Sequence, residues 1–275
     1  KSNVASVPSY VGGKLQLSSN LANSVRELIS NRKKWTYFPK QIQEWLKLQS
    51  TYSKIPKPNE ILIEVFPFKC KFFTIIYSFE GKNANETLGF LLTKRFSKLN
   101  LNPISFSAND YSLAIESLNE PIEIKKLFDN DLIKNELKNW LSETPLLKRI
   151  FRDNAIISGL VHRHYPGKTK SGKQILFSTD LMYDVLLKYE PNHILLESIY
   201  KEALNSLVDI RKIKKILKKI KKNLQYINVK SISPLAVPLI LQINKENILK
   251  ENLSDKLIED LEKEILKEAN VLSIN

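Results

Sequence analysis

ILIEVFPFKCKFFTIIYSF, residues 61–79, holds the clearest strand pattern in this chain of 275 residues. Two runs within it, Ile61 to Phe66 and Phe72 to Phe79, are rich in β-branched and aromatic side chains, which favour extended backbone. The short run Lys69-Cys70-Lys71 between them is typical of a turn. The stretch therefore predicts a β-hairpin.

A second hairpin is predicted downstream of the first. In ISFSANDYSLAIE, residues 104–116, two strand-like runs meet at Asn109-Asp110, residue types that favour turns. Asn109, Asp110 and Tyr111 could also be imagined as a general-acid site, but a turn demands just such residues. Between the hairpins, residues 85–98 place four apolar side chains on one helical face. The expected arrangement is an antiparallel sheet covered on one side by this helix.

Helical patterns dominate the rest of the chain. Before the first hairpin they cover residues 21–29 and 41–49. After Pro121 they cover residues 132–141, 145–164, 179–189, 194–207, 209–224 and 254–269, with a short strand at 226–229. The predicted class is α+β: two antiparallel hairpins with a covering helix, followed by a mostly helical region. We expect an α+β part over residues 1–120 and a mainly helical part over residues 121–275, or one composite domain.

Charge and cysteine content limit the class of protein. The chain has 43 Lys plus Arg against 29 Asp plus Glu, a net charge of +14, which favours polyanionic partners. A single cysteine, Cys70, excludes an internal disulfide framework and a thiolate metal cluster, and it predicts a reducing compartment, the cytoplasm. No apolar run of about 18 residues predicts a membrane span. The only methionine is Met182, so we expect the chain to be part of a longer protein.

The chain shows no recognisable catalytic or metal-binding set. Its three histidines are His162, His164 and His193, and the first two, at i and i+2, would point to different sides of a helix. We therefore expect no metal site. No Ser-His-Asp or Cys-His arrangement and no paired carboxylates stand out. We expect no enzyme activity from this chain alone.

A basic loop in the second half of the chain is the first candidate for binding nucleic acid. Between Asp153 and Asp180 there is no acidic residue, whereas Arg163, Lys168, Lys170 and Lys173 are all present. Concentrated positive charge on a glycine-containing loop suits a phosphate backbone. A solvated turn with surface lysines fits the same spacing equally well.

The same loop partly matches a nucleotide-binding phosphate loop. Gly167, Gly172 and Lys173 fit its first part, but Gln174 stands where the Mg²⁺-binding hydroxyl must be. The residues before Gly167 also read as a helix and not as a buried strand. We expect no ATP site here and no cofactor in this chain.

Two predicted basic helices are further candidates for binding nucleic acid. In the helix predicted at 145–164, Arg149, Arg152 and Arg163 share one side with Gly159, which would let a sugar-phosphate chain approach closely. Pairing of these arginines with acids elsewhere in the fold is the alternative. Residues 211–222 hold eight basic residues around one apolar stripe. This pattern favours a solvated lysine-rich face, with non-specific phosphate attraction as the second interpretation.

Several blocks of sequence together resemble one family. They are VPSYVGGKLQLSSNLANSVREL, LQSTYSKIP, YSFEGK, FSANDY, ISGLVHRHYPGKTKSGKQ, STDLMYDVLLKYEPNHILL and SPLAVPLIL. In order and spacing they resemble the C-terminal region of bacterial ligase-associated DEXH-box helicases, relatives of the large helicase-related (Lhr) type. The resemblance runs from about residue 7 to about residue 243.

The resemblance implies a 3′-to-5′ ATP-dependent DNA-repair helicase with two RecA-like motor domains, a winged helix and this last domain. Neither the nucleotide-binding glycine loop nor a D-E-x-H box occurs here, so ATP and Mg²⁺ would belong to motor domains outside this chain. The implied partners are single-stranded DNA or a DNA/RNA hybrid, the motor and winged-helix domains, and a DNA ligase with an associated nuclease.

The resemblance also implies a stacking residue near the start of the chain. The family motif V-P-x-W-x-G-G-[RK] matches Val7, Pro8, Tyr10, Gly12, Gly13 and Lys14, with tyrosine in place of tryptophan. Stacking contributes about 1–3 kcal/mol per base and should weaken with the smaller ring. Gln16 replaces a proline that is common in the family. The expected contacts are a base on Tyr10 and phosphates on Lys14, Arg149, Arg152, Arg163, Lys168, Lys170 and Lys173.

The sharpest structural expectation is that Tyr10 and the loop at 163–173 converge on one strand of nucleic acid. Two alternatives stay open. The chain could be a structural or interaction module that packs on the motor or on ligase and nuclease partners, marked by a large apolar patch with scattered basic residues. It could also be a standalone nucleic-acid enzyme, although it lacks a catalytic set.

Overall fold

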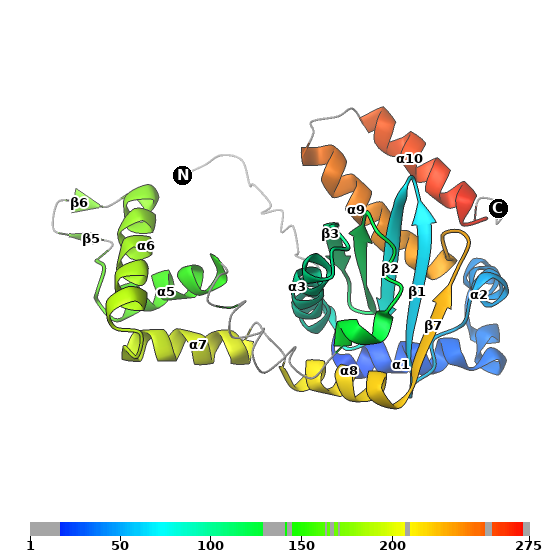
Figure 1. Cartoon of the computed structure of the whole chain (residues 1–275), viewed down its shortest axis with the longest axis horizontal. Helices are drawn as coiled ribbons and strands as arrows, with labels where there is room; N and C mark the ends of the chain where they lie inside the picture. The colour runs from blue at the N-terminus through cyan, green and yellow to red at the C-terminus, as the bar shows by residue number, and fades with distance from the viewer. Residues whose placement is uncertain are drawn as a thin grey trace, which may run out of the picture.

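A five-stranded sheet forms the centre of the computed structural model, which describes residues 17–128, 141, 145–162, 164–165, 168–169, 171–206, 210–250 and 255–271. The strand order is β3-β4-β2-β1-β7 (Figure 1). The strands are β1 (Ile61–Phe68), β2 (Lys71–Tyr77), β3 (Pro103–Ala108), β4 (Ser112–Ser117) and β7 (Leu224–Asn228). Helices pack on this sheet, so the predicted α+β class is confirmed.

Both predicted hairpins are present. In the first, Phe68 pairs with Lys71, and the two residues between them, Lys69 and Cys70, have φ of 48° and 59°. Positive φ at both central positions is typical of a type I′ turn, whose twist matches that of the flanking strands. The pairing of β1 with β2 is antiparallel.

The second hairpin turns at the residues expected to do so. Ala108 pairs with Leu113, and Asn109 Oδ1 accepts the backbone N–H groups of Tyr111 and Ser112, both at 2.9 Å. Asp110 Oδ1 accepts the N–H of Lys82 at 3.2 Å, the first residue of helix α3 (Lys82–Lys98). These side chains therefore hold the predicted turn, and Asp110 in addition holds the start of α3.

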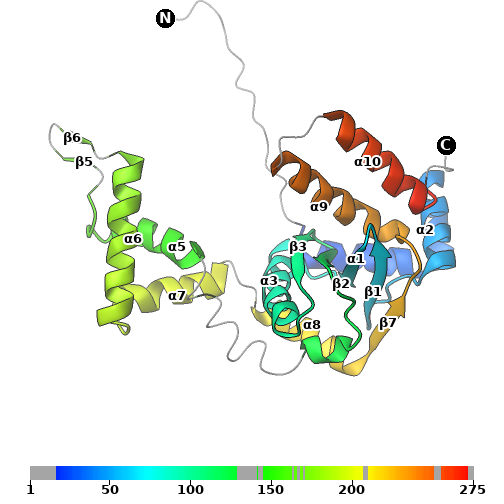
Figure 2. The same cartoon turned by 45° about the horizontal axis from the view of Figure 1, so that its top comes forward.

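Helices cover both faces of the sheet, whereas the sequence predicted one covering helix. Ile61, Ile63 and Val65 of β1 face α3 and α8 (Ile210–Lys222). Leu62 and Phe66 face the opposite layer. That layer contains α1 (Ser19–Ser30), η1 (Arg32–Tyr37), α2 (Lys40–Tyr52), α9 (Val237–Lys250) and α10 (Asp255–Glu268), as Figure 2 shows. A strand that is apolar on both faces is typical of such double burial.

Strand β7 brings the second half of the chain back to the sheet. It pairs in parallel with β1, from Ile61 opposite Leu224 to Val65 opposite Asn228. Residues on both sides of position 120 therefore build one sheet. The short strand was predicted at 226–229 and lies at Leu224–Asn228. Among the described strands, β7 stands at the end of the order and is therefore an edge of the sheet.

Helices α5 (Pro145–Ile157), α6 (Gly172–Tyr189) and α7 (Ile194–Ser206) form a group beside the sheet (Figures 1 and 2). Phe151 of α5 is fully buried and its ring lies 5.5 Å from that of Tyr183 on α6. The helix predicted at 145–164 was too long, because α5 ends at Ile157. Gly159 adopts φ of 75°, a left-handed conformation that glycine favours and that terminates the helix.

None of the described helices is both long and apolar enough for a membrane span. Within the same residues, no group of three His, Cys, Asp or Glu side chains is placed to hold a metal ion.

Candidate nucleic-acid interface

The predicted arginines of α5 differ in their surroundings. Arg149 is exposed and makes no ion pair with another described residue. Arg152 lies 3.5 Å from Asp180 of α6, between Nη2 and Oδ1, and the neighbouring Lys148 lies 2.8 Å from Asp184. The structure thus shows the alternative pairing with acids for Arg152, while the Arg149 side chain remains open to a phosphate. Helix α5 ends at Ile157, and Arg163 lies outside the described residues.

The basic loop forms a small hairpin and then a capped helix start. Strands β5 (His164–Tyr165) and β6 (Lys168–Thr169) pair antiparallel. Ser171 Oγ accepts the N–H of Gln174 at 3.3 Å, and Gln174 Oε1 accepts the N–H of Ser171 at 2.9 Å. Gln174 is therefore half of a capping box that starts α6. Lys173 is exposed in the first turn of this helix.

The other predicted contact residues lie outside what the structure describes. These are Tyr10, Lys14, Arg163 and Lys170, and for Lys168 only the backbone strand is described. The predicted convergence of Tyr10 with the basic loop stays a prediction. Of the predicted set, the structure brings Arg149 and Arg152 together on α5 and places Lys173 at the start of the neighbouring α6.

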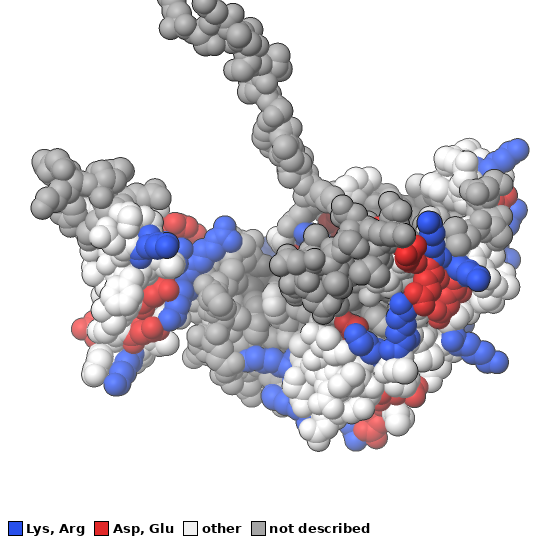
Figure 3. All heavy atoms as spheres, turned by 90° about the horizontal axis from the view of Figure 1, so that it is seen from above, with Lys and Arg blue, Asp and Glu red and all other residues white. Residues whose placement is uncertain are grey.

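Helix α8 has two basic sides with different roles. Its inner side sends Lys215 and Lys219 to the carboxylate of Glu80, at 2.9 and 3.1 Å. Its outer side exposes Arg211, Lys214, Lys218 and Lys222, which recur every three or four residues and so form one stripe along the helix. No acidic residue occurs on α8. By contrast, acidic and basic side chains are intermixed on the face seen from above in Figure 3.

Sequence reasoning missed Glu80, the partner of these lysines. Glu80 is fully buried and lies in the YSFEGK block, where Phe79 and Gly81 have φ of 58° and 92°. Beside it, the fully buried Arg26 of α1 donates to the backbone oxygens of Ser78 and Glu60. Burial lowers the pKa of Arg26 from its ordinary range to about 10, although Glu80 and Glu60 oppose this shift. The YSFEGK block thus joins α1, α8 and the sheet.

Comparison with known proteins identifies the class of this chain. Residues 55–236 match the model of the family described as DEAD/H associated. The chain belongs to the DEAD/H associated family. The matched segment contains all five strands of the sheet and the helices that carry Arg149, Lys173 and the outer stripe of α8.

Relatives of this DEAD/H associated chain are helicases of the Lhr type. An ATP-dependent helicase Lhr-Core from Methanocaldococcus jannaschii is 28% identical over 280 residues, covering 95% of this chain and 33% of the relative. Lhr-Core protein 2 from Thermococcus barophilus is 28% identical over 231 residues, covering 74% of this chain and 26% of the relative. The chain therefore spans about a quarter to a third of the length of these curated relatives.

One solved structure has a similar fold. It is the Mycobacterium smegmatis helicase Lhr bound to ssDNA and AMP-PNP, with a TM-score of 0.68 at 18% identity. The match covers 86% of this chain and 33% of that one. The match covers a larger share of the chain than residues 55–236 do, so the shared fold extends beyond the DEAD/H associated segment.

A buried carboxyl group lies at the centre of the DEAD/H associated sheet. Glu64 of β1 is fully buried and accepts hydrogen bonds from Gln49 at 2.9 Å, Tyr77 at 2.8 Å, Ser53 and Ser233. Burial raises the pKa of Glu64 above its ordinary 4.5, while the four hydrogen bonds act in the opposite direction. The cluster joins α2, two strands and the start of η4 (Pro234–Ala236) across one face of the sheet.

We expect Glu64→Gln to change how stability depends on pH. Because the folded-state pKa of Glu64 is raised, its favourable contribution is fully present below pH 4.5 and is lost as pH rises through the folded pKa. The free energy of unfolding of the parent minus that of the variant should therefore be smaller at pH 8 than at pH 4. Urea denaturation at a series of pH values measures this difference.

Glu44→Gln is the matched control, since Glu44 is exposed on the neighbouring helix α2. If the free energies of unfolding of the parent and of Glu64→Gln differ by the same amount at every pH, the role assigned to Glu64 is contradicted. The same trend in Glu44→Gln would also contradict it.

Proposed function

We propose that this chain is the DEAD/H associated part of an Lhr-type ATP-dependent helicase and that it contacts the single strand of DNA along which the helicase moves. The match of residues 55–236 to this family carries the proposal, because the same segment holds the exposed cations of α5, α6 and α8. The Lhr-Core relative from M. jannaschii, which matches 95% of the chain, supports it.

The parent helicase in this proposal is the bacterial, ligase-associated type, and the chain is its C-terminal region. RecA-like motor domains hold ATP and Mg²⁺ and move 3′ to 5′, while this chain grips the strand and hydrolyses no ATP. The parent acts in DNA repair in the cytoplasm, with a DNA ligase and a nuclease as partners. A DNA/RNA hybrid is an alternative substrate.

Individual residues have different parts in this proposal. Arg149, Lys173 and the outer stripe of α8 meet phosphates, because their side chains are exposed and make no ion pair with another described residue. Arg152 contributes only by exchanging Asp180 for a phosphate. Lys14, Arg163, Lys168 and Lys170 add phosphate contacts, and Tyr10 stacks on a base.

We expect the affinity of the chain for a single-stranded oligonucleotide to depend steeply on salt. Phosphate contacts release counterions, so about five contacts should weaken binding roughly 100-fold between about 50 and 200 mM salt. The salt slope is the slope of the logarithm of the association constant against the logarithm of the salt concentration. Replacing Arg149 and Lys173 together by glutamine should make this slope less steep by about 0.7 per removed contact. Fluorescence anisotropy with a labelled oligothymidylate measures both effects.

Controls separate specific contacts from net charge. Lys40→Gln with Lys47→Gln removes the same charge from exposed positions on α2 and should leave the slope unchanged. Tyr10→Ala should weaken binding by about 1–3 kcal/mol without changing the slope, because stacking releases no counterions. An affinity that does not change with salt would rule out the phosphate grip.

A second candidate function is that of an interaction module within the parent helicase. Helix α6 exposes Phe177, Leu181, Val185 and Tyr189 at four-residue spacing, with Phe177 73% exposed. Such an apolar stripe favours a protein contact. Since the relatives are about three times as long, the rest of the parent chain is the proposed occupant. If the chain binds the oligonucleotide negligibly at every salt concentration, the interaction module becomes the better supported of the two functions.

A further inference from the structure

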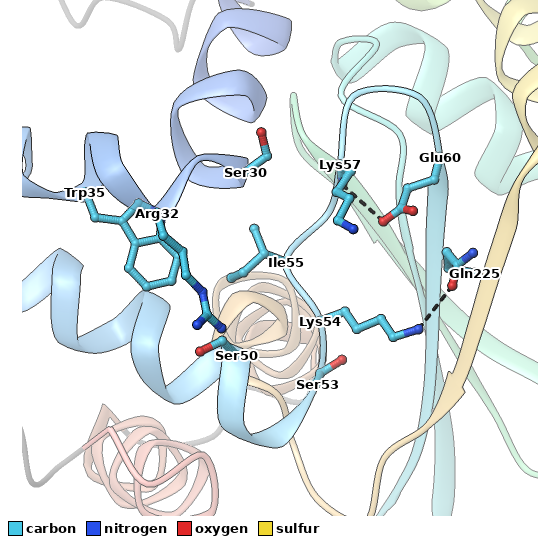
Figure 4. A pocket seen from close by; sticks show the side chains of 10 residues that line it. All are labelled: Ser30, Arg32, Trp35, Ser50, Ser53, Lys54, Ile55, Lys57, Glu60 and Gln225. Carbon is cyan, nitrogen blue, oxygen red and sulfur yellow. Dashed lines mark hydrogen bonds between the residues drawn. The ribbon is translucent and has the colours of Figure 1, made fainter.

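A positively charged pocket lies at the edge of the sheet, and none of its lining residues belongs to α5, α6 or α8. It is about 400 Å³ in volume and lies between η1, the end of α2 with the loop that follows, and the edge strand β7 (Figure 4). A second hollow of about 300 Å³ shares Ser30, Lys57 and Glu60 with it and extends to Asn59 and Asn223. This size is typical of small-molecule sites.

Three cations line the pocket, and none of them forms an ion pair with a described residue. Arg32 lies over the Trp35 ring at 5.8 Å, and Lys54 donates to the Gln225 side-chain oxygen at 3.1 Å. The Lys57 side chain is exposed. The single carboxylate of the lining is Glu60, which accepts the backbone N–H of Lys57 at 3.3 Å. The lining therefore has a formal charge of +2.

The serine hydroxyls in the lining determine a second property that a ligand of this pocket must have. Ser30 Oγ donates to the backbone oxygen of Glu27 at 2.9 Å, and Ser50 Oγ donates to that of Lys47 at 2.8 Å. Ser53 donates to Glu64. Each hydroxyl proton is thus committed, and the hydroxyl oxygens remain as acceptors. A ligand that satisfies this pocket carries negative charge for the cations and hydrogen-bond donors for the serine oxygens.

We propose that this pocket binds a nucleotide through its phosphate. A phosphate ester meets Arg32, Lys54 and Lys57 with charge-assisted hydrogen bonds, which are the strong ones. Sugar hydroxyl or base amino groups donate to the serine oxygens, and the half-buried Ile55 offers apolar surface to the sugar or the base. The bound nucleotide is either a free mononucleotide or one unit of a nucleic-acid strand.

Calorimetric titration of the chain with 5′-deoxyadenosine monophosphate tests the proposal. We expect deoxyadenosine, which lacks the phosphate, to bind at least about tenfold more weakly. Arg32→Gln with Lys54→Gln should also reduce the affinity for the monophosphate about tenfold or more. The matched control is Lys33→Gln with Lys34→Gln, exposed neighbours on η1 outside the pocket, which should change the affinity less than about twofold.

Equal affinities for the monophosphate and for deoxyadenosine would overturn the proposal. It would also be overturned if the pocket variant and the control variant lost the same affinity for the monophosphate. An absence of binding would overturn it too, and a covering protein segment would then be the better explanation. If the double variant fails to fold, Lys57→Gln alone gives the same comparison, because only the backbone of Lys57 bonds to Glu60.

A competition experiment separates the two sources of the nucleotide. If the pocket holds one unit of a strand, the monophosphate displaces a short oligodeoxyadenylate and the pocket variants weaken both ligands. If it holds a free nucleotide, the monophosphate binds but displaces nothing. Either result supports the pocket. Variants of α8 and Lys173 affect the salt-dependent grip alone, so the two proposals fail separately.

Discussion

Glu80→Ala should lower the free energy of unfolding by about 3–5 kcal/mol, the range for removing one partner of a buried ion pair. Glu80 is fully buried, and its carboxylate holds Lys215 and Lys219 at 2.9 and 3.1 Å. Lys215 is half exposed and can turn to water, so its loss is small. The cost comes from Lys219, whose side chain is 18% exposed, and from the buried Arg26 nearby.

The pKa of Lys219 shows why its amine depends on Glu80. Burial lowers this pKa, and Glu80 is the group that raises it again through a hydrogen bond and its charge. Without the carboxylate, Lys219 is left desolvated beside Arg26 and must lose its proton or move. Helix α8 then shifts, and with it the outer stripe proposed to meet phosphates. We therefore expect Glu80→Ala to weaken single-strand binding as well.

Chemical denaturation measures the effect, with Glu86→Ala as the control. Glu86 is 42% exposed and pairs with Lys82 at 3.5 Å on the surface of α3, so its loss should cost less than about 1 kcal/mol. Replacing Glu80 and Lys219 together by methionine should recover much of the loss, because both charges leave the interior. A Glu80→Ala protein as stable as Glu86→Ala would contradict the role of this carboxylate.

Local sequence signals were sufficient for the hairpins. Lys69-Cys70 and Asn109-Asp110 are turns whose geometry depends on neighbouring residues, and both occur where the residue types predicted them. The second covering layer was harder to predict. Glu64 interrupts an apolar strand and suggests an exposed face, yet four polar side chains from distant segments bury it.

The sequence named cations that the structure places on α5 and α6, but it did not predict which acidic side chains pair with them. Arg149, Arg152 and Lys173 were identified from charge and spacing, but the pairing of Arg152 with Asp180 depends on how α5 packs on α6. The inner lysines of α8 looked solvated because Glu80 lies 135 residues from Lys215 in sequence. The pocket at Arg32, Lys54 and Lys57 gave no local signal, since α8 must place β7 beside β1 before it forms.

Phe151→Ala should cost about 3–5 kcal/mol within the group formed by α5, α6 and α7, because Phe151 is fully buried and leaves a cavity against Tyr183. This group lies beside the sheet (Figure 1), so the loss should be local. Amide hydrogen exchange should become faster in α5–α7 and stay slow in β1 and β2. Phe177→Ala, which removes a 73% exposed ring from α6, is the control and should leave exchange unchanged.

The effect of Phe151→Ala on single-strand binding depends on which exposed cations lie on the destabilised helices α5, α6 and α7. Arg149 and Lys173 lie on α5 and α6, whereas the outer stripe belongs to α8, whose apolar side packs on the sheet. Phe151→Ala should therefore reduce the salt slope of single-strand binding by about the same amount as Arg149→Gln with Lys173→Gln, near 0.7 per lost contact. Equal loss of exchange protection in the sheet would show that the helical group and the sheet unfold together. If the salt slope of Phe151→Ala equals that of the parent, the phosphate contacts to single-stranded DNA lie on α8 and not on α5 or α6.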